Sequence, residues 1–186
     1  MRKNFDTKHL TYPQPVYILA AYSEDGAPCA MNAAWGGISG AKEISLCIGI
    51  RHKTTKNILH SGAFTVSIAD EANMVACDYV GIVSGNDEPD KFAKAGFHAT
   101  KSEFVNAPII DELLMTLECK LTSYDEKTGH LIGEIINVSA DESIINEEGK
   151  VDPQKLRPIS FDPMNHTYLA TGEKVGEAFK DGLKLK

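Results

Sequence analysis

The chain has 186 residues, of which 26 are acidic and 19 are basic, so its formal net charge at pH 7 is −7. This length is sufficient for one domain with a sizeable hydrophobic core, and we expect residues 1–186 to form a single domain. The acidic balance argues against a nucleic-acid-binding protein, because such proteins carry a broad excess of basic side chains.

The N-terminal region shows no pattern of a signal peptide or of a membrane segment. Its apolar run at 16–21 is too short for either, and no other stretch approaches transmembrane length. The four cysteines, at 29, 47, 77 and 119, are far apart and form no CxxC pair. Buried free thiols in a reducing compartment explain them better than disulfides or a zinc site. We therefore expect a cytoplasmic protein without a membrane partner.

Alternating patterns and short apolar runs predict mostly β-strands along the chain. In chain order, the predicted strands are 15–23, 29–39, 44–50, 63–69, 98–105, 114–125, 130–145 and 157–162. The sequence EKTG at 126–129 is typical of a hairpin turn between two of these strands.

Helical signals are fewer than strand signals. Thr54 or Thr55 can cap a short helix at 56–61 that stops at Gly62. Helical spacing or end signals also mark the segments 71–82, 89–95 and 173–182. Because strands dominate and the helices do not alternate with them, the pattern predicts a mainly β fold. We expect an antiparallel β-barrel with helical insertions rather than a doubly wound α/β sheet. No GxGxxG sequence follows a strand, so a Rossmann dinucleotide site is not indicated.

A cluster of basic residues and hydroxyls, RHKTT at 51–55, lies where a predicted strand gives way to a helix. The first turn of a helix offers unpaired N–H groups and the positive end of the dipole, which together favour anions. Arg51 can bind two phosphate oxygens and Lys53 adds a point charge. Taken alone, however, this turn is more simply read as a solvated loop with an ordinary threonine cap.

Two further segments favour a ligand site. Residues 32–37 are small apart from Trp35, so they can lie against a flat ring and offer it backbone groups; a glycine-rich bulge in an edge strand is the alternative. Ser84 and Gly85 form a tight turn, and Lys91 follows in a new helix. This second segment is otherwise a simple loop between helices. Trp35 itself either stacks on a ligand or is a core or interface residue.

In this order and spacing, the segments 15–39, 47–68, 78–97 and 130–139 resemble the flavin reductase-like family, which binds FMN on a split β-barrel. The sequence is most similar to the flavoredoxin branch of that family. The resemblance covers nearly the whole chain and extends to the tail at 167–182.

The resemblance implies an FMN site built from all three segments. Residues 32–35 would border the isoalloxazine ring, the basic turn would hold the phosphate, and the segment from 84 to 91 would complete the pocket. The implied cofactor-binding residues are Asn32, Ala33, Ala34, Trp35, Arg51, His52, Lys53, Thr54, Thr55, Ser84, Gly85 and Lys91. Because RHKTT departs from the usual family pattern, the choice between Arg51 and His52 as the phosphate contact stays open. Tyr168 either approaches the ring or only packs.

The function that the resemblance implies is an FMN-dependent oxidoreductase that takes electrons from NADH or NADPH. The acceptor would be a free flavin, an iron centre or a partner protein. The flavin itself carries such chemistry, and no catalytic triad spacing is recognisable. An electron carrier without nicotinamide turnover is the alternative, and a barrel that binds another planar ligand such as haem is a third reading.

The resemblance further implies a homodimer with the flavin site at or near the subunit interface, since an open barrel leaves edges that need covering. No metal site is expected, because the histidines lack metal-ligand spacing.

Overall fold

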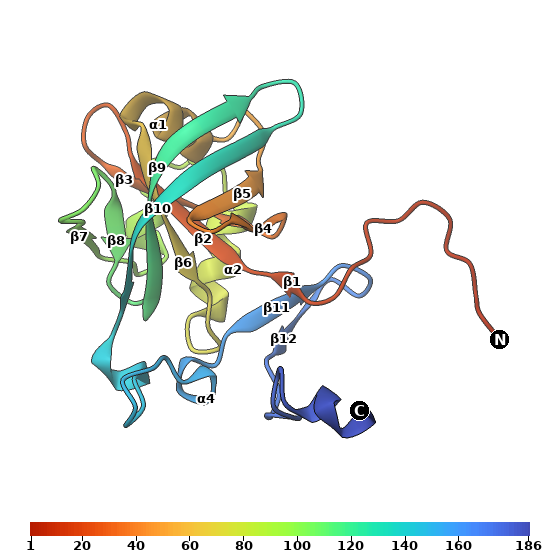
Figure 1. Ribbon diagram of the computed structural model, residues 1–186. Coiled ribbons are helices and arrows are strands. Elements are labelled where there is room, and N and C mark those ends of the chain that lie inside the picture. Colours follow the sequence, from red (N-terminus) through yellow and green to blue (C-terminus); the bar gives the residue numbers. More distant parts are fainter.

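The computed structural model describes residues 1–186 and is built mainly of antiparallel strands (Figure 1). The strands are β1 (Gln14–Pro15), β2 (Tyr17–Tyr22), β3 (Pro28–Ala33), β4 (Gly36–Gly40), β5 (Glu43–Cys47), β6 (Ala63–Ile68), β7 (Ala99–Lys101), β8 (Pro108–Ile110), β9 (Met115–Asp125), β10 (His130–Ala140), β11 (Ile159–Asp162) and β12 (Thr167–Ala170). The helices are α1 (Lys53–Ser61), α2 (Met74–Ile82), α3 (Lys91–Lys94) and α4 (Pro153–Leu156), with 3₁₀ turns η1 (Glu142–Ile144) and η2 (Asp181–Leu185).

The main sheet has seven strands in the order β3-β2-β6-β9-β10-β5-β4. Its two edge strands, β3 and β4, follow one another in the chain with only Ala34 and Trp35 between them. A connection this short brings the two edges together, so the sheet must curl into a barrel that is open along this line. The Cys47 N–H donates to the Trp35 carbonyl at 2.7 Å, which ties the connection to β5. Register shifts between β9 and β10 provide the local bending that such a curl requires.

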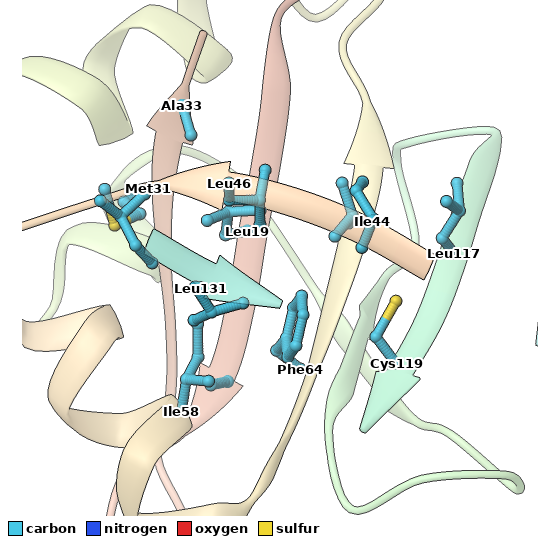
Figure 2. Packing of buried hydrophobic residues seen from close by; sticks show 13 residues of the cluster. Leu19, Met31, Ala33, Ile44, Leu46, Ile58, Phe64, Leu117, Cys119 and Leu131 are labelled. Carbon is cyan, nitrogen blue, oxygen red and sulfur yellow. The ribbon is translucent and has the colours of Figure 1, made fainter. Parts of the chain in front are cut away.

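Apolar side chains fill both faces of β2. Leu19 and Ala21 point into the barrel, where they join a cluster of thirteen buried residues that includes Phe64 and Leu131. Figure 2 shows these side chains gathered between the strands, with Ile58 reaching in from α1. Ile18 and Ala20 point the other way, into a second cluster of twelve residues beneath α2 and α3. Burial on both faces explains why this strand reads as a continuous apolar run.

The mainly β barrel with helical insertions is confirmed, and the deviations concern single elements. The predicted strand 29–39 is divided into β3 and β4 at the barrel opening. The predicted strand at 98–105 is reduced to the short β7, and β8, β12 and the short α4 were not predicted. None of the helices is long and apolar enough to span a membrane.

The predicted C-terminal helix at 173–182 is wrong, because only the 3₁₀ turn η2 forms, at the end of that segment. Val175 and Phe179 are fully exposed, so no packed face supports a helix here. The predicted threonine cap of α1 is also wrong. The helix begins at Lys53, three residues earlier than expected, with His52 at the N-cap. The stop at Gly62 is confirmed, since this residue is left-handed with φ 69° and donates its N–H to the Ile58 carbonyl.

Candidate functional site

A cavity of about 630 Å³ lies where the end of β3, the start of α1 and the α2–α3 connection meet. Aromatic side chains of β11 and β12 close one side of it. Ten of the twelve predicted site residues line this cavity, namely Asn32, Ala33, Ala34, Trp35, His52, Lys53, Thr54, Ser84, Gly85 and Lys91. The fold therefore brings the three predicted segments to one place. The other two predicted residues, Arg51 and Thr55, do not line it.

One end of the cavity is electropositive because α1 begins there. His52 is the N-cap residue, yet its side chain accepts no cap hydrogen bond, and the first turn holds no acidic residue. The N–H groups of the first turn are thus left for a ligand, together with the positive end of the helix dipole. The Lys53 side chain lies beside them. Burial lowers the pKa of His52, and the positive charges of Lys91 and Arg51 lower that pKa further.

Arg51 and Thr55 lie just outside the cavity for different reasons. Arg51 is exposed, and its carbonyl accepts a hydrogen bond of 3.1 Å from the Asn86 side chain, which ties the turn to the α2–α3 connection. Thr55 is fully buried behind the first turn of α1, and its hydroxyl has no hydrogen-bond partner. Arg51 can therefore contribute its charge to the site, whereas Thr55 is placed to support the turn from behind.

Lys91 has a structural partner as well as a place in the cavity wall. Its ammonium donates to the carbonyls of Val80 and Val83 at 2.9 and 2.8 Å, so it satisfies the open C-terminus of α2. The side chain is only 3% exposed, and burial lowers its pKa. An ammonium has three donors, so one remains for a ligand.

Two glycines let α2 and its following loop lie directly against the cavity floor. A Cβ at Gly85 would come within 3.0 Å of the Cys29 sulfur and 3.3 Å of Lys53 Cβ. A Cβ at Gly81 would come within 2.8 Å of Asn32 Cβ. Any side chain at either position would push the α2 side away from β3. Gly81 was not among the predicted residues, although its place near the end of a helical pattern is a signal of close packing.

The opposite end of the cavity carries a hydrogen-bonded group of side chains that was not predicted from the sequence. The Tyr168 hydroxyl donates to the Asp78 carboxylate at 2.7 Å. The Asn32 amide donates to the Cys77 carbonyl at 3.3 Å and lies 3.5 Å from the Tyr168 hydroxyl. Burial raises the pKa of Tyr168, and the hydrogen bond to Asp78 raises it further. One available signal was a single carboxylate within the apolar segment MVACDYVGI.

Trp35 lies at the rim of the cavity and is not a core residue. Its side chain is 43% exposed, and the ring of His9 packs edge-on against it with centroids 5.9 Å apart. The small residues Ala33 and Ala34 precede it along the same wall. The alternative of a buried tryptophan is therefore wrong, and the indole remains free to border a ligand.

The two ends of the cavity are separated along β3. Cys29 lies at the α1 end, 3.4 Å from the Thr54 hydroxyl, and Asn32 lies at the Tyr168 end. Three residues of strand span about 10 Å. The cavity thus suits an elongated ligand with an anionic group at one end and a flat ring at the other. FMN has both features, and the donors and small wall residues fit it.

Comparisons with known proteins agree with this arrangement. A family model, the flavin reductase like domain, matches residues 9–160. The solved flavoredoxin of Desulfovibrio vulgaris (Miyazaki F) is 38% identical, with a TM-score of 0.93, covering 98% of this chain and 100% of that chain. A flavoredoxin from Methanosarcina acetivorans is 25% identical, with a TM-score of 0.90 and full coverage of both chains (100% and 100%).

A third solved structure is the FMN-binding domain of a flavin reductases-like enzyme from Shewanella baltica OS155. It is 22% identical, with a TM-score of 0.77, and covers 88% of this chain and 89% of that chain. These likenesses confirm the predicted split-barrel fold.

Proposed function

The chain belongs to the flavin reductase-like family, and we propose that it is an FMN-binding oxidoreductase whose residues 1–186 act as one domain. One observation carries the proposal. A single cavity joins an uncapped helix start with Lys53 at one end to a wall of small and aromatic residues at the other. This combination suits a ligand with a phosphate and a flat ring.

The residues of this chain divide the binding between them. Lys53 and the first-turn N–H groups of α1 would hold the phosphate, with the third donor of Lys91 close by. Ala33, Ala34 and Trp35 would border the ring and exclude water from one side of it. Bound FMN would supply the hydride-transfer and electron-transfer chemistry.

We further propose NADH or NADPH as the electron donor, in keeping with the family of reductases to which the chain belongs. The acceptor is a free flavin, an iron centre or a partner protein. A second candidate function is electron transfer without nicotinamide turnover. The 38% identity to a flavoredoxin over 98% of the chain favours this candidate.

We also propose that the protein is a cytoplasmic homodimer with the cavity near the subunit interface. The rim residue Trp35 and the nearby Ile38 of edge strand β4 are 43% and 65% exposed, and both line a shallow groove along β4. Pairing of two copies would cover both. The four cysteines are free, as suits a reducing compartment.

The deciding experiment is binding of FMN and of riboflavin to the purified protein, followed by absorption and fluorescence. We expect a flavin spectrum and tighter binding of FMN than of riboflavin, because only FMN has the phosphate. Equal affinities would remove the phosphate role of α1, and a haem spectrum would overturn the flavin proposal.

Steady-state oxidation of NADH or NADPH with free flavin as acceptor separates the two candidate functions. Turnover supports the reductase. A protein that binds FMN but does not oxidise either nicotinamide is instead an electron carrier.

A further inference from the structure

The cavity is electrically polarised along β3. Asp78 is the one carboxylate among the residues that line it, and it lies at the Tyr168 end. The cationic side chains of the lining are Lys53 and Lys91. Lys53 lies at the α1 end, and Lys91 lies close to His52, the N-cap residue of α1. A cavity that only had to attract an anionic ligand would gain nothing from a carboxylate, so Asp78 calls for a separate explanation.

The Asp78 carboxylate is held in position by three elements. Asp78 belongs to α2, its hydrogen-bond donor Tyr168 belongs to β12, and Asn32 of β3 lies within 3.5 Å of the same hydroxyl. The close approach of Gly81 to Asn32 keeps α2 against β3 at this level. Asp78 and Tyr168 are both half-buried. The carboxylate therefore cannot swing into solvent without breaking its hydrogen bond to Tyr168.

The polarity of the cavity fixes the direction of an elongated ligand. A phosphate is attracted to the uncapped start of α1 and repelled by Asp78. The two ends are about 10 Å apart along the strand. A ligand with a phosphate at one end and an uncharged ring at the other must therefore enter with its ring towards Asp78.

We propose that Asp78, positioned by Tyr168, lowers the reduction potential of the flavin held in this cavity. This inference rests on the proposed function. A flavin ring that takes up two electrons from a donor and one proton from solvent becomes an anion, whereas the oxidised ring is uncharged. A fixed carboxylate nearby raises the free energy of the reduced anion and leaves the oxidised form nearly unaffected. The effect is larger in a partly buried site than in water, and it makes the bound flavin a stronger reductant.

Tyr168 acts through Asp78 and is a positioning residue. Its hydroxyl donates to the carboxylate, and its ring packs near Phe161 with centroids 6.1 Å apart. In this way the β11–β12 hairpin holds the charge at the cavity wall.

The test is the midpoint potential of FMN-loaded protein at pH 7, measured by dithionite titration against reference dyes. Asp78→Asn removes the charge and keeps the size, so it should bind reduced FMN about tenfold more tightly relative to oxidised FMN. For a two-electron couple this is a rise of about 30 mV. Asp78→Glu keeps the charge and should stay close to the parent. Asp111→Asn removes the same charge at an exposed position outside the cavity, and it should leave the potential unchanged.

The midpoint potential of the parent protein is a second test, and it needs no variant. Its bound FMN should have a lower potential than free FMN in the same buffer. A parent potential equal to or above that of free FMN overturns the inference, and so does an Asp78→Asn potential equal to that of Asp111→Asn. An Asp78→Glu shift as large as that of Asp78→Asn also overturns it, because shape rather than charge would then be responsible. If neither the parent nor Asp111→Asn binds FMN, the proposed function itself fails.

Discussion

At the scale of single residues, the cationic side chains around the cavity have different tasks. Lys53 has no protein acceptor and lies beside uncapped N–H groups, so its charge is available to a ligand. Lys91 donates two of its three N–H groups to carbonyls at the C-terminus of α2. Arg51 is exposed outside the lining. Three cations that look alike in the sequence thus differ in their surroundings: Lys53 lines the cavity, Lys91 also caps α2, and Arg51 lies outside the cavity.

We expect Lys53→Ala to weaken FMN binding by about tenfold to a hundredfold, because a charge-assisted hydrogen bond contributes about 1.5–3 kcal/mol. Arg51→Ala is the matched control and should weaken binding by less than about tenfold, since a charge acting across solvent is screened. Fluorescence titration with FMN gives both dissociation constants. If Arg51→Ala has the larger effect, the phosphate contact has been assigned to the wrong residue.

At the scale of elements, the cavity depends on how closely α2 packs on β3 and on how the terminal strands are held. Gly81 and Gly85 set the first distance. Asp162 holds the terminal strands in place. It accepts hydrogen bonds from the Tyr12 hydroxyl, from two backbone N–H groups of the following turn and from the Asn165 amide. It thereby joins the segment before β1 to the β11–β12 hairpin, which carries Phe161 and Tyr168.

Gly81→Ala should weaken FMN binding and lower the free energy of unfolding. Alanine gains about 1 kcal/mol over glycine inside a helix. The added methyl group would lie 2.8 Å from Asn32 Cβ, and such overpacking costs about 1–3 kcal/mol. We therefore expect a net loss of up to about 2 kcal/mol, measured by urea unfolding of the FMN-free protein. Gly172→Ala, where a Cβ meets nothing within 4 Å, is the control. Equal FMN affinities for the two variants would contradict the packing role of Gly81.

Asp162 should make the protein less stable in acid. Hydrogen bonds from Tyr12 and Asn165 lower the pKa of Asp162 from 3.8 to about 2. Because the folded state holds this proton less tightly than the unfolded state, the contribution is complete above about pH 4 and is lost as the pH falls towards 2. Thermal unfolding between pH 7 and pH 2 should show the parent more stable than Asp162→Asn at neutral pH. The two should converge near pH 2, and a difference that stays constant over this range would argue against the carboxylate.

At the scale of the whole molecule, the barrel leaves apolar surface that a second copy can cover. Edge strand β4 exposes Ile38, and the tail after β12 exposes Val175, Phe179 and Leu185 almost completely. The N-terminal segment runs outwards from the body, while the C-terminal tail lies beyond β12 (Figure 1). Exposed apolar residues on such segments are typical of chains that pack against another subunit.

Light scattering on the FMN-loaded protein should therefore give about twice the chain mass of 20.3 kDa down to low micromolar concentration. Ile38→Glu should shift the protein towards the monomer and weaken FMN binding at the same time, because the exposed Ile38 follows Trp35 at the cavity rim. Val75→Glu, a change at a similarly exposed residue of α2, is the control. A mass near 20.3 kDa for the parent would rule out the dimer and require one chain to supply all flavin contacts.

The sequence by itself determined the features that depend on neighbouring residues. Alternation in β9 and β10 and the continuous apolar run of β2 predicted a mainly β barrel, because side-chain direction in a strand follows from position alone. Gly62 predicted the end of α1, because few other residues adopt a left-handed backbone. The turn at 51–55 predicted a helix start for the same local reason, since a helix start carries its unpaired N–H groups wherever it lies. Only the structure shows that this helix start faces a cavity.

Only the tertiary structure decided which distant residues meet and what each of them faces. Asp78 and Tyr168 are 90 positions apart, and their contact exists only because the chain brings β12 back next to α2. Thr55 looked like a ligand beside Thr54, yet the helix turns it inwards, since successive residues differ by about 100° around the axis. The tail at 173–182 has a helical pattern but no surface to bury it against. Local patterns fix backbone geometry, whereas the closure of the sheet fixes long-range contacts, and the polarity of the cavity is a product of that closure.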